Sequence, residues 1–456
     1  MSDYDVLVIG SGPGGYLAAI LAAQRGLKTA CVEKERLGGV CLNWGCIPSK
    51  ALLKAAEHYQ FIKEEVSSFG LGLDNPRHDW AKVVARSRKI ADQSERGVRF
   101  LFKKHGVEPI TGTASLQGGG KVAVGDKLLT AKHIIVATGA RAKAFPGMEV
   151  DGERVMTYRS AIAATTQPES VIVLGSGAIG LEFAYLYNSF GTKVTLVEAA
   201  DRLCPLEDAD VSAEVARSFK KQGVDIVTGL ACTSIRRDGD GVQAVLADGR
   251  ELRASHALLA LGVVPNVEGI GLDVAGVALE KGAIKVDDSF RTTAAGIYAI
   301  GDVAGPPALA HAAYAEAHVC IARIKGEHTP DVAYDNMPAA TYCQPQIASV
   351  GLTEAQAKAK NLAFTVGRFP LSANGKARAI GASEGFVKVL VGKEHGEILG
   401  AHLVGHDVSE LLASFVMARG AEVTAAHFLH TVHAHPTVGE AMFEAVAEAV
   451  GLGAHL

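Results

Sequence analysis

The chain has 456 residues, 48% of them hydrophobic and 21% charged, and at ~150 residues per domain this length predicts about three domains. A net charge of −4 without a basic stripe excludes nucleic acid as the main partner. The absence of a long apolar run excludes a membrane-spanning helix, and the acidic start of the chain does not fit a signal peptide. Seven scattered cysteines do not make a disulfide framework, so we expect a reducing, cytoplasmic location.

A short apolar run and a glycine-rich turn open the chain. Residues 4–9 predict a buried parallel strand. A helix pattern over 16–25 comes after the turn, and a strand over 29–32 ends in Glu33. The glycines of the turn have GxGxxG spacing and are Gly10, Gly12 and Gly15.

The same pattern returns in the middle of the chain. A strand over 171–174 precedes a helix pattern that stops at Gly191, and a strand over 193–197 ends in Glu198. The first glycine and the acid are 23 residues apart in both copies. The glycines of the second copy are Gly175, Gly177 and Gly180.

Each copy predicts a dinucleotide site. In such a turn the first glycine bends the chain, the second admits the pyrophosphate, and the third lets the helix pack on the strand. The acid accepts hydrogen bonds from a ribose, and Glu198 therefore favours NAD over NADP, although the nearby Arg202 leaves NADP open. The alternative is two glycine-rich turns in ordinary α/β units.

Three further predicted strands end beside glycine. Residues 134–137 lead to Thr138 and Gly139, and residues 258–261 lead to Gly262. A strand over 297–300 leads to Gly301 and then Asp302, whose carboxylate is suited to hold the polyol of a cofactor. The alternative for Asp302 is a simple turn.

Cys41 and Cys46 lie five residues apart before a predicted helix. In a regular helix their Cα atoms would be roughly 8–9 Å apart, beyond the ~7 Å limit for a disulfide. A bridge therefore needs an irregular segment, which Gly45 permits, and Pro48 suits the first turn of the helix. Near a helix N-terminus Cys46 gains thiolate character. The alternative is two unpaired thiols.

A histidine–proline segment lies near the other end of the chain. His435 is a candidate general base, and Glu440, five residues on, is suited to orient its imidazole. One alternative is a polar turn. The other is a zinc site, whose ligands would be Cys41, Cys46, His433 and His435.

Four segments together resemble one family. They are the cysteine segment GGVCLNWGCIPSK, the two GxGxxG turns, the sequence AIGD at 299–302 and the sequence HAHPTVGE at 433–440. In this order they resemble the flavin-dependent pyridine nucleotide–disulfide oxidoreductases over nearly the whole chain. The ending Pro48-Ser49-Lys50 resembles the branch of that family that oxidises dihydrolipoamide.

The resemblance implies an α/β fold with two Rossmann-like dinucleotide-binding domains, one for FAD and one for NAD, and a C-terminal α+β dimerisation domain. The implied divisions are an FAD-binding domain at 1–145, an NAD-binding domain at 146–264, a central domain at 265–332 that completes the FAD half, and an interface domain at 333–456.

It also implies the residues that hold the cofactors, with Lys50 and Glu182 paired near the flavin. For FAD they are Gly10, Gly12, Gly15, Glu33, Gly39, Lys50, Ala114, Thr138, Gly139, Asp302, Ala308, Leu309, Ala310 and His311. For NAD they are Gly175, Gly177, Gly180, Glu182, Glu198 and Gly262.

The implied reaction is the oxidation of protein-bound dihydrolipoamide to lipoamide with NAD⁺, through FAD and a Cys41–Cys46 disulfide. Cys41 would meet the substrate and Cys46 would lie beside the flavin. The His435–Glu440 dyad would come from the other subunit of a homodimer, with the His435–Pro436 bond cis. The implied partners are lipoyl domains and the E2 core of 2-oxo acid dehydrogenase complexes, or the glycine cleavage complex.

One position departs from the family pattern, because Val263 stands where members often have arginine. The missing cation lies near the expected NAD site and bears on NAD affinity. Two other functions stay open. One is an NAD(P)H-dependent reductase of another disulfide, such as a glutathione-like or low-molecular-weight thiol. The other is a flavoprotein with a mainly structural role in a larger assembly.

Overall fold

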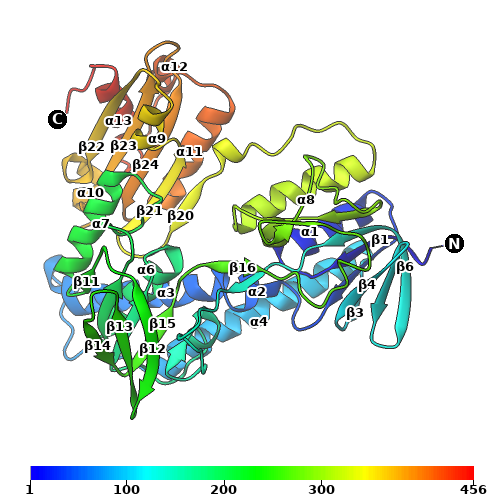
Figure 1. Cartoon of the computed structure of the whole chain (residues 1–456). Coiled ribbons are helices and arrows are strands. Elements are labelled where there is room, and N and C mark those ends of the chain that lie inside the picture. The colour runs from blue at the N-terminus through cyan, green and yellow to red at the C-terminus, as the bar shows by residue number, and fades with distance from the viewer. Residues whose placement is uncertain (1, 456) are drawn as a thin grey trace.

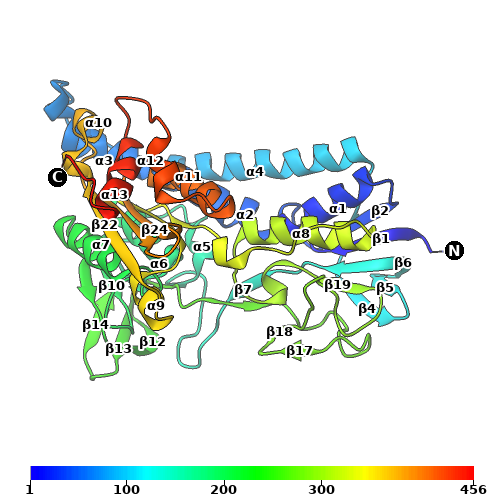
Figure 2. The ribbon, with the colours of Figure 1, turned by 90° about the horizontal axis from the view of Figure 1, so that it is seen from above.

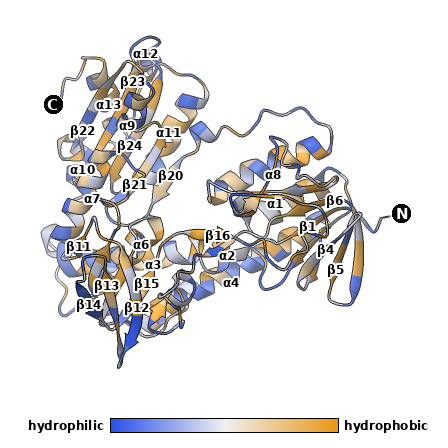
Figure 3. Cartoon of the chain, in the orientation of Figure 1, coloured by the Kyte–Doolittle hydropathy of each residue, from blue (hydrophilic) through white to orange (hydrophobic). Residues whose placement is uncertain are grey.

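Three large sheets organise residues 2–455, which are the residues that this computed structural model describes. Figure 1 shows the first sheet at the right, the second at the lower left and the third at the upper left. In Figure 3 the strands at the centre of each unit are mainly orange and the outer loops mainly blue, so each sheet has its own apolar core.

The first sheet has the strand order β3-β2-β1-β6-β5-β4, and β19 pairs with the free side of β6. Strands β1, β2, β3, β6 and β19 run parallel, whereas β4, β5 and β6 form an antiparallel meander. Val6, Leu7 and Val8 are fully buried, as a central parallel strand covered on both faces requires. The bounds are β1 (Tyr4–Ile9), β2 (Thr29–Glu33), β3 (Glu108–Thr111), β4 (Ala114–Gly118), β5 (Lys121–Val124), β6 (Lys127–Val136) and β19 (Ile297–Ala299).

Helices α1 and α8 pack against each other beside this sheet, and the long α4 runs alongside them (Figure 2). Helix α1 begins at Pro13, three residues before the predicted start at Tyr16, because proline at the first helical position has the required φ angle already set. The bounds are α1 (Pro13–Gln24), α2 (Gly39–Asn43), α3 (Cys46–Gln60), η1 (Phe61–Glu65), η2 (Val66–Phe69), α4 (Trp80–His105), η3 (Gly301–Ala304) and α8 (Ala310–Ile324).

The second unit repeats the parallel plan in the order β11-β10-β9-β15-β8, and an antiparallel sheet β12-β13-β14 packs beside it. The predicted strand over 193–197 is confirmed to the residue as β10. The bounds are β8 (Val155–Met156), α5 (Tyr158–Ala161), β9 (Ser170–Leu174), α6 (Ala178–Ser189), β10 (Lys193–Val197), α7 (Ala209–Lys221), β11 (Asp225–Val227), β12 (Cys232–Asp238), β13 (Gly241–Leu246), β14 (Glu251–Ala254) and β15 (His256–Leu259).

The third unit is an antiparallel sheet in the order β20-β21-β24-β23-β22. Helices α11 and α13 pack on it. The bounds are η4 (Tyr334–Asn336), β20 (Ala339–Thr341), β21 (Gln346–Gly351), α9 (Glu354–Ala359), β22 (Phe364–Pro370), η5 (Leu371–Ala373), α10 (Gly375–Ala379), β23 (Phe386–Gly392), β24 (Ile398–Gly405), α11 (Val408–Gly420), α12 (Ala425–His430) and α13 (Glu440–Ala449).

The units meet through apolar contacts and short strands. One core cluster contains residues of α3, α6, α7 and the third sheet, among them Leu52, Phe219 and Phe386. Two short pairs complete the fold: β7 (Ala140–Ala142) with β16 (Val263–Pro265), and β17 (Leu279–Glu280) with β18 (Ala283–Ile284). These sheets make an α/β protein of two Rossmann-like units and a C-terminal α+β unit, while the four-part division by residue number stays a prediction. None of the helices between residues 2 and 455 has the length and apolarity that a bilayer crossing requires.

Candidate active site

Cys41 and Cys46 form a disulfide with their Cα atoms 4.7 Å apart. Helix α2 ends at Asn43 and α3 begins at Cys46, and Gly45 between them has non-helical angles of φ −132° and ψ −117°. The predicted break at Gly45 is therefore confirmed. Pro48 is the third residue of α3, where a missing backbone N–H costs no helical hydrogen bond.

Cys46 is the first residue of the 15-residue helix α3. The positive end of the helix dipole stabilises a thiolate at this position when the disulfide is reduced. Within residues 2–455 the cysteines outside this bridge are Cys31, Cys204, Cys232, Cys320 and Cys343.

Lys50 lies one turn after Cys46 and pairs with Glu182 of α6. Its Nζ is 2.8 Å from Oε1 and 3.0 Å from Oε2 of Glu182, and it also lies 4.3 Å from the ring centre of Tyr342. The Tyr342 N–H donates to Glu182 Oε1 at 3.1 Å. The predicted pairing of Lys50 with Glu182 is confirmed, and Tyr342 is a neighbour that the sequence analysis missed, because nothing local to 342 marks it.

The first glycine-rich turn has the geometry of a dinucleotide site. Gly10 has φ +97°, and a Cβ there would lie 2.4 Å from Ala137 O; a Cβ on Gly15 would lie 1.9 Å from Gly10 O. In contrast, a Cβ on Gly12 would meet no atom within 4 Å. The first and third glycines are thus required by the fold, and the second faces open space, as it must where a pyrophosphate approaches the backbone.

The second turn repeats this geometry. A Cβ on Gly175 would lie 2.5 Å from Ala260 O, one on Gly180 would lie 1.8 Å from Gly175 O, and one on Gly177 would meet nothing within 4 Å. Two turns with the same close approaches and the same open position fit two dinucleotides.

The acids after β2 and β10 make matching contacts. Glu33 Oε2 accepts from Ser11 N–H at 2.9 Å and from its hydroxyl at 2.6 Å. Glu198 Oε2 accepts from Ser176 N–H at 2.8 Å and from its hydroxyl at 2.7 Å. Both carboxylates therefore reach back to their own glycine-rich turn. Arg202 is held by backbone, because its Nη2 donates to Pro205 O at 3.0 Å and Glu207 O at 3.2 Å.

Asp302 lies in η3, after β19. Burial, with a further contribution from the nearby Glu316 carboxylate, raises the pKa of Asp302 above its usual range. Within residues 2–455 no side chain donates a hydrogen bond to the Asp302 carboxylate. A half-buried acceptor without a side-chain donor fits the hydroxyl groups of a flavin ribityl chain.

The remaining residues expected at FAD lie around the same unit. Gly39 lies against Gly12, because a Cβ on Gly39 would be 2.7 Å from Gly12 Cα. Thr138 Oγ1 donates to Asn266 O at 2.8 Å. Other placements are Gly139 with φ +69°, Ala114 as the first residue of β4, and Ala308, Leu309, Ala310 and His311 at the start of α8.

Gly262 and Val263 lie where β15 leads into β16. Gly262 has φ +93° and its carbonyl accepts from Lys143 N–H at 3.1 Å. Val263 is 37% exposed and carries no charge at the position where the family pattern often has arginine.

His435 and Glu440 form a dyad at the start of α13. The His435 Nδ1 is 2.8 Å from Glu440 Oε1, and the Thr437 N–H donates to Glu440 Oε2 at 2.8 Å. These hydrogen bonds, first that of Thr437 and then that of His435, lower the pKa of Glu440. An ionised Glu440 only accepts, so the Nδ1–H of His435 donates and Nε2 stays free to take a proton. The His435–Pro436 bond is cis, as expected.

The dyad and the disulfide lie apart within one chain. In Figure 1, α12 and α13 lie in the upper part of the third unit, whereas α2 lies near the centre of the molecule, beside α4. The His435 side chain is 80% exposed. The structure therefore does not bring Cys41, Cys46, His433 and His435 together as zinc ligands, and no cluster within residues 2–455 is arranged to hold a metal ion.

Comparisons with known proteins agree with this geometry. Residues 4–317 match the family model described as pyridine nucleotide-disulphide oxidoreductase, and residues 337–446 match its dimerisation domain. Curated relatives named dihydrolipoyl dehydrogenase include one from Zymomonas mobilis, 45% identical over 100% of both chains. Another, from Mycobacterium tuberculosis, is 45% identical over 99% of both.

Solved structures with the same fold include LpdA from Mycobacterium tuberculosis, with a TM-score of 0.91 and 29% identity over 97% of this chain and 99% of that one. The HOCl-induced flavoprotein disulfide reductase RclA from Escherichia coli has a TM-score of 0.89 and 25% identity over 97% of this chain and 99% of that one. The family models and the full-length relatives lead to one conclusion: the chain belongs to the pyridine nucleotide–disulphide oxidoreductase family.

Proposed function

We propose that the chain is a dihydrolipoyl dehydrogenase, which oxidises protein-bound dihydrolipoamide to lipoamide and reduces NAD⁺. The observation that carries the proposal is the Cys41–Cys46 disulfide at the start of α3. In the sequence it lies between the two glycine-rich turns. Full-length curated relatives at 45% identity bear the name of this activity.

The cofactors of the chain are FAD and NAD, as in its family. We assign FAD to the turn at Gly10, with Glu33 toward the adenosine ribose and Asp302 toward the ribityl chain. We assign NAD to the turn at Gly175, with Glu198 toward its ribose. A carboxylate at Glu198 repels a 2′-phosphate, so NAD is preferred over NADP.

The thiol chemistry follows from the cysteine pair and the dyad. His435 Nε2 takes a proton from one thiol of dihydrolipoamide, and Glu440 holds the ring and stabilises its charged form. The substrate thiolate attacks Sγ of Cys41, the Cys41–Cys46 bond breaks, and Cys46 leaves as a thiolate. The second substrate thiol then attacks the mixed disulfide, the lipoamide ring closes, and Cys41 is released.

The positive end of α3 stabilises the Cys46 thiolate that this exchange produces. The chemistry supplied by bound FAD is two-electron transfer from the reduced cysteine pair to NAD⁺. The Lys50–Glu182 pair joins α3, which carries Cys46, to α6 of the NAD-binding unit, and so fixes the first unit against the second where the two cofactors are to meet.

The active form that we propose is a homodimer in which His435 of one subunit serves the disulfide of the other. This arrangement is supported by the dimerisation domain at 337–446, by the exposure of His435 and by the separation of the dyad from the disulfide in Figure 1. We further propose that it acts in the cytoplasm on lipoyl domains bound to the E2 core of a 2-oxo acid dehydrogenase complex or in glycine cleavage.

The test compares substrates on the purified, FAD-loaded protein. We expect NADH to form from NAD⁺ with dihydrolipoamide, little activity with NADP⁺, and little with glutathione. Turnover of glutathione disulfide with NAD(P)H, without dihydrolipoamide oxidation, would move the assignment to the reductase of another disulfide. A lipoylated domain as substrate, with its unlipoylated form as control, tests whether the chain oxidises dihydrolipoamide that is attached to a protein.

A further inference from the structure

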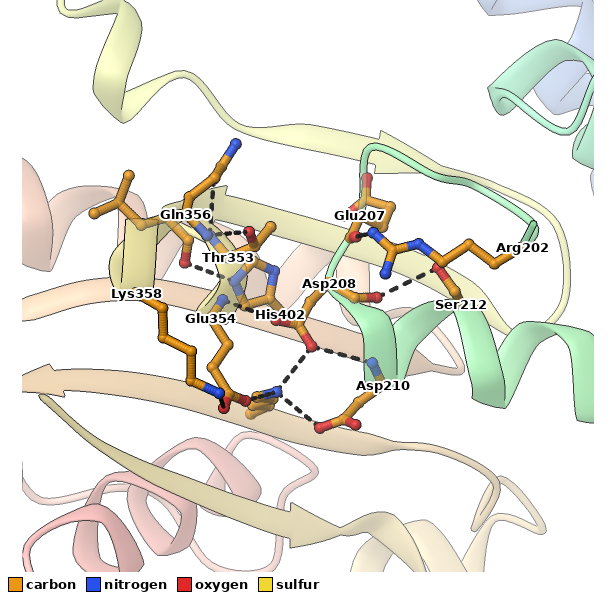
Figure 4. A network of polar contacts seen from close by, with 12 residues as sticks. Arg202, Glu207, Asp208, Asp210, Ser212, Thr353, Glu354, Gln356, Lys358 and His402 are labelled. Atoms are coloured by element: carbon orange, nitrogen blue, oxygen red, sulfur yellow. Dashed lines mark hydrogen bonds and ion pairs between the residues drawn. The ribbon is translucent and has the colours of Figure 1, made fainter. Parts of the chain in front are cut away.

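An ion cluster centred on Lys388 joins the NAD-binding unit to the third sheet. Lys388 lies in the middle of β23, and its side chain is only 2% exposed. Its Nζ is 2.8 Å from each of three carboxylates, those of Asp208, Asp210 and Glu354. Figure 4 shows these carboxylates converging from α7 on one side and α9 on the other.

Asp208 is the most enclosed member of the cluster, with a side chain 1% exposed. It is the N-cap of α7, because its Oδ1 accepts from Asp210 N–H at 3.1 Å. Its Oδ2 accepts from Glu354 N–H at 3.0 Å. Asp208 thus caps a helix of the second unit and, through the same carboxylate, holds α9 and β23 of the third.

The charges of the cluster depend on one another. Burial raises the pKa of Asp208, but hydrogen bonds from Lys388 and from Glu354 N–H outweigh it, and the net effect lowers the pKa. Burial lowers the pKa of Lys388, and hydrogen bonds to Asp208, Asp210 and Glu354 raise it by more. Beside Lys388 on β24, burial lowers the pKa of His402, which disfavours a charged ring there. Lys388 is therefore the cation that neutralises Asp208.

The cluster continues into the residues that border the expected NAD site. Segment 199–207 connects β10 to α7. At its start Ala200 N–H donates to Glu198 Oε1 at 2.9 Å. In its middle Cys204 N–H donates at 3.0 Å to the hydroxyl of Ser176, a residue of the glycine-rich turn. At its end comes Asp208, fixed by Lys388. Segment 199–207 is thus tied to Glu198, to the turn and to the third sheet.

Attachment of the two units does not require this ion cluster. Val211, Val215 and Phe219 of α7 already share one apolar cluster with residues of the third sheet, which are Ile347, Phe386 and Val404. Apolar residues usually stabilise such a contact at least as well as buried charges do. What the ions add is a fixed position along the interface, because one amine must lie within hydrogen-bond distance of three carboxylates at once.

We propose that Lys388 is a positioning residue for NAD⁺: through Asp208 it sets the place of segment 199–207 and thereby of Glu198 and Ser176 at the adenosine ribose. The inference rests on the proposed NAD site at Gly175. By this proposal the third sheet helps to shape the dinucleotide site. The same sheet lies within residues 337–446, which match the dimerisation domain.

The test measures binding of ADP-ribose, which is NAD⁺ without its nicotinamide ring, to the FAD-loaded protein by calorimetry. We expect Lys388→Met to weaken ADP-ribose binding by about tenfold or more, because small displacements of binding groups have effects of this size. FAD content and the KM for dihydrolipoamide should be unchanged. Asp208→Asn, which keeps the shape of the cap, should weaken binding in the same direction and serves if Lys388→Met fails to fold.

The matched control is Lys358→Met, which removes an exposed cation from the same Glu354, 2.6 Å away on α9. It should leave ADP-ribose binding unchanged. Wild-type ADP-ribose affinity in a folded Lys388→Met or Asp208→Asn variant overturns the proposal, as does equal weakening by Lys358→Met. Because ADP-ribose binding involves no thiol substrate, these results are independent of whether the wild type oxidises dihydrolipoamide.

Discussion

Lys50 and Glu182 lie 132 residues apart in the sequence and form an ion pair between α3 and α6. Glu182 has a side chain 9% exposed, and Lys50 one 34% exposed. The pair connects the helix that begins with the redox disulfide to the helix that follows the second glycine-rich turn. A change at either residue therefore affects both proposed cofactor sites.

Replacing Lys50 with methionine should leave the Glu182 carboxylate with the Tyr342 N–H as its remaining donor. We expect this to cost about 2 kcal/mol, the usual size for a hydrogen bond to a charged group, and to lower the thermal midpoint by a few degrees. Lys54→Met is the control, because Lys54 pairs with Glu57 on the exposed face of α3, where a pair contributes ~0.5 kcal/mol. Equal midpoints for the two variants would contradict the account.

Gly177 should tolerate alanine structurally and lose dinucleotide binding. Its φ of −68° and ψ of −178° are open to any residue, and a Cβ there meets no protein atom. We expect Gly177→Ala to fold normally and to bind ADP-ribose at least about tenfold more weakly, because the Cβ occupies the path of the pyrophosphate.

The companion substitution Gly180→Ala should behave in the opposite way, because its Cβ would lie 1.8 Å from Gly175 O. We expect it to destabilise the fold by about 1–3 kcal/mol or more. Thermal midpoints and ADP-ribose titrations of both variants check these expectations. Unchanged ADP-ribose affinity in Gly177→Ala would remove this turn from the NAD site.

His435→Gln should slow dihydrolipoamide oxidation by about 10²–10⁴-fold, the usual contribution of a positioned base, with FAD still bound. His433→Gln is the matched control, because the partly exposed His433 lies two residues away and its Nδ1 pairs with Thr431 O, whereas Glu440 pairs with His435. Steady-state rates with saturating dihydrolipoamide distinguish them. Near-normal turnover of His435→Gln, or equal losses in both variants, would exclude His435 as the base.

The Lys388 cluster predicts a pH dependence of stability. The pKa of Asp208 is lower in the folded state than its ordinary value of 3.8, so its contribution is complete above that pH and is lost as the pH falls through the folded value. The pKa of Lys388 is raised above 10.5, so its contribution is complete below 10.5 and is lost as the pH rises through the folded value.

Thermal midpoints of the wild type and Asp208→Asn should therefore differ by a constant amount between about pH 5 and 9. The difference should shrink below pH 3.8, where the wild-type carboxyl becomes neutral like the amide. A difference that widens as the pH falls would show that Asp208 is not held ionised by Lys388.

Local sequence patterns were sufficient to predict the strands and turns that form the proposed cofactor sites. The runs 4–9 and 193–197 predict β1 and β10 to the residue, because a glycine or an acid follows each run directly. Helix geometry indicated that a Cys41–Cys46 bridge needs an irregular segment, which Gly45 permits, whereas the bridge itself was implied by the family resemblance. The predicted start of α1 is three residues late, since Pro13 and the two glycines after it are typical of a turn.

The contacts between distant segments could not be derived in this way. Lys388 and Asp208 are 180 residues apart, and a lysine inside an apolar strand does not indicate which acid it meets. The one local signal was the lysine itself, in the strand sequence FVKVLVG, where a buried charge requires a partner. The pairing of Tyr342 with Glu182 likewise depends on tertiary packing.

The central claim is that Cys41 and Cys46 carry electrons from dihydrolipoamide to NAD⁺, and thiol trapping tests it most directly. The FAD-loaded protein is mixed with dihydrolipoamide without oxygen, either with or without a following excess of NAD⁺. Only then is it treated with an alkylating agent and examined by mass spectrometry. We expect Cys41 and Cys46 to be alkylated only after dihydrolipoamide and to be protected again once NAD⁺ is added. NADH formation while both cysteines remain in the disulfide throughout would contradict the account.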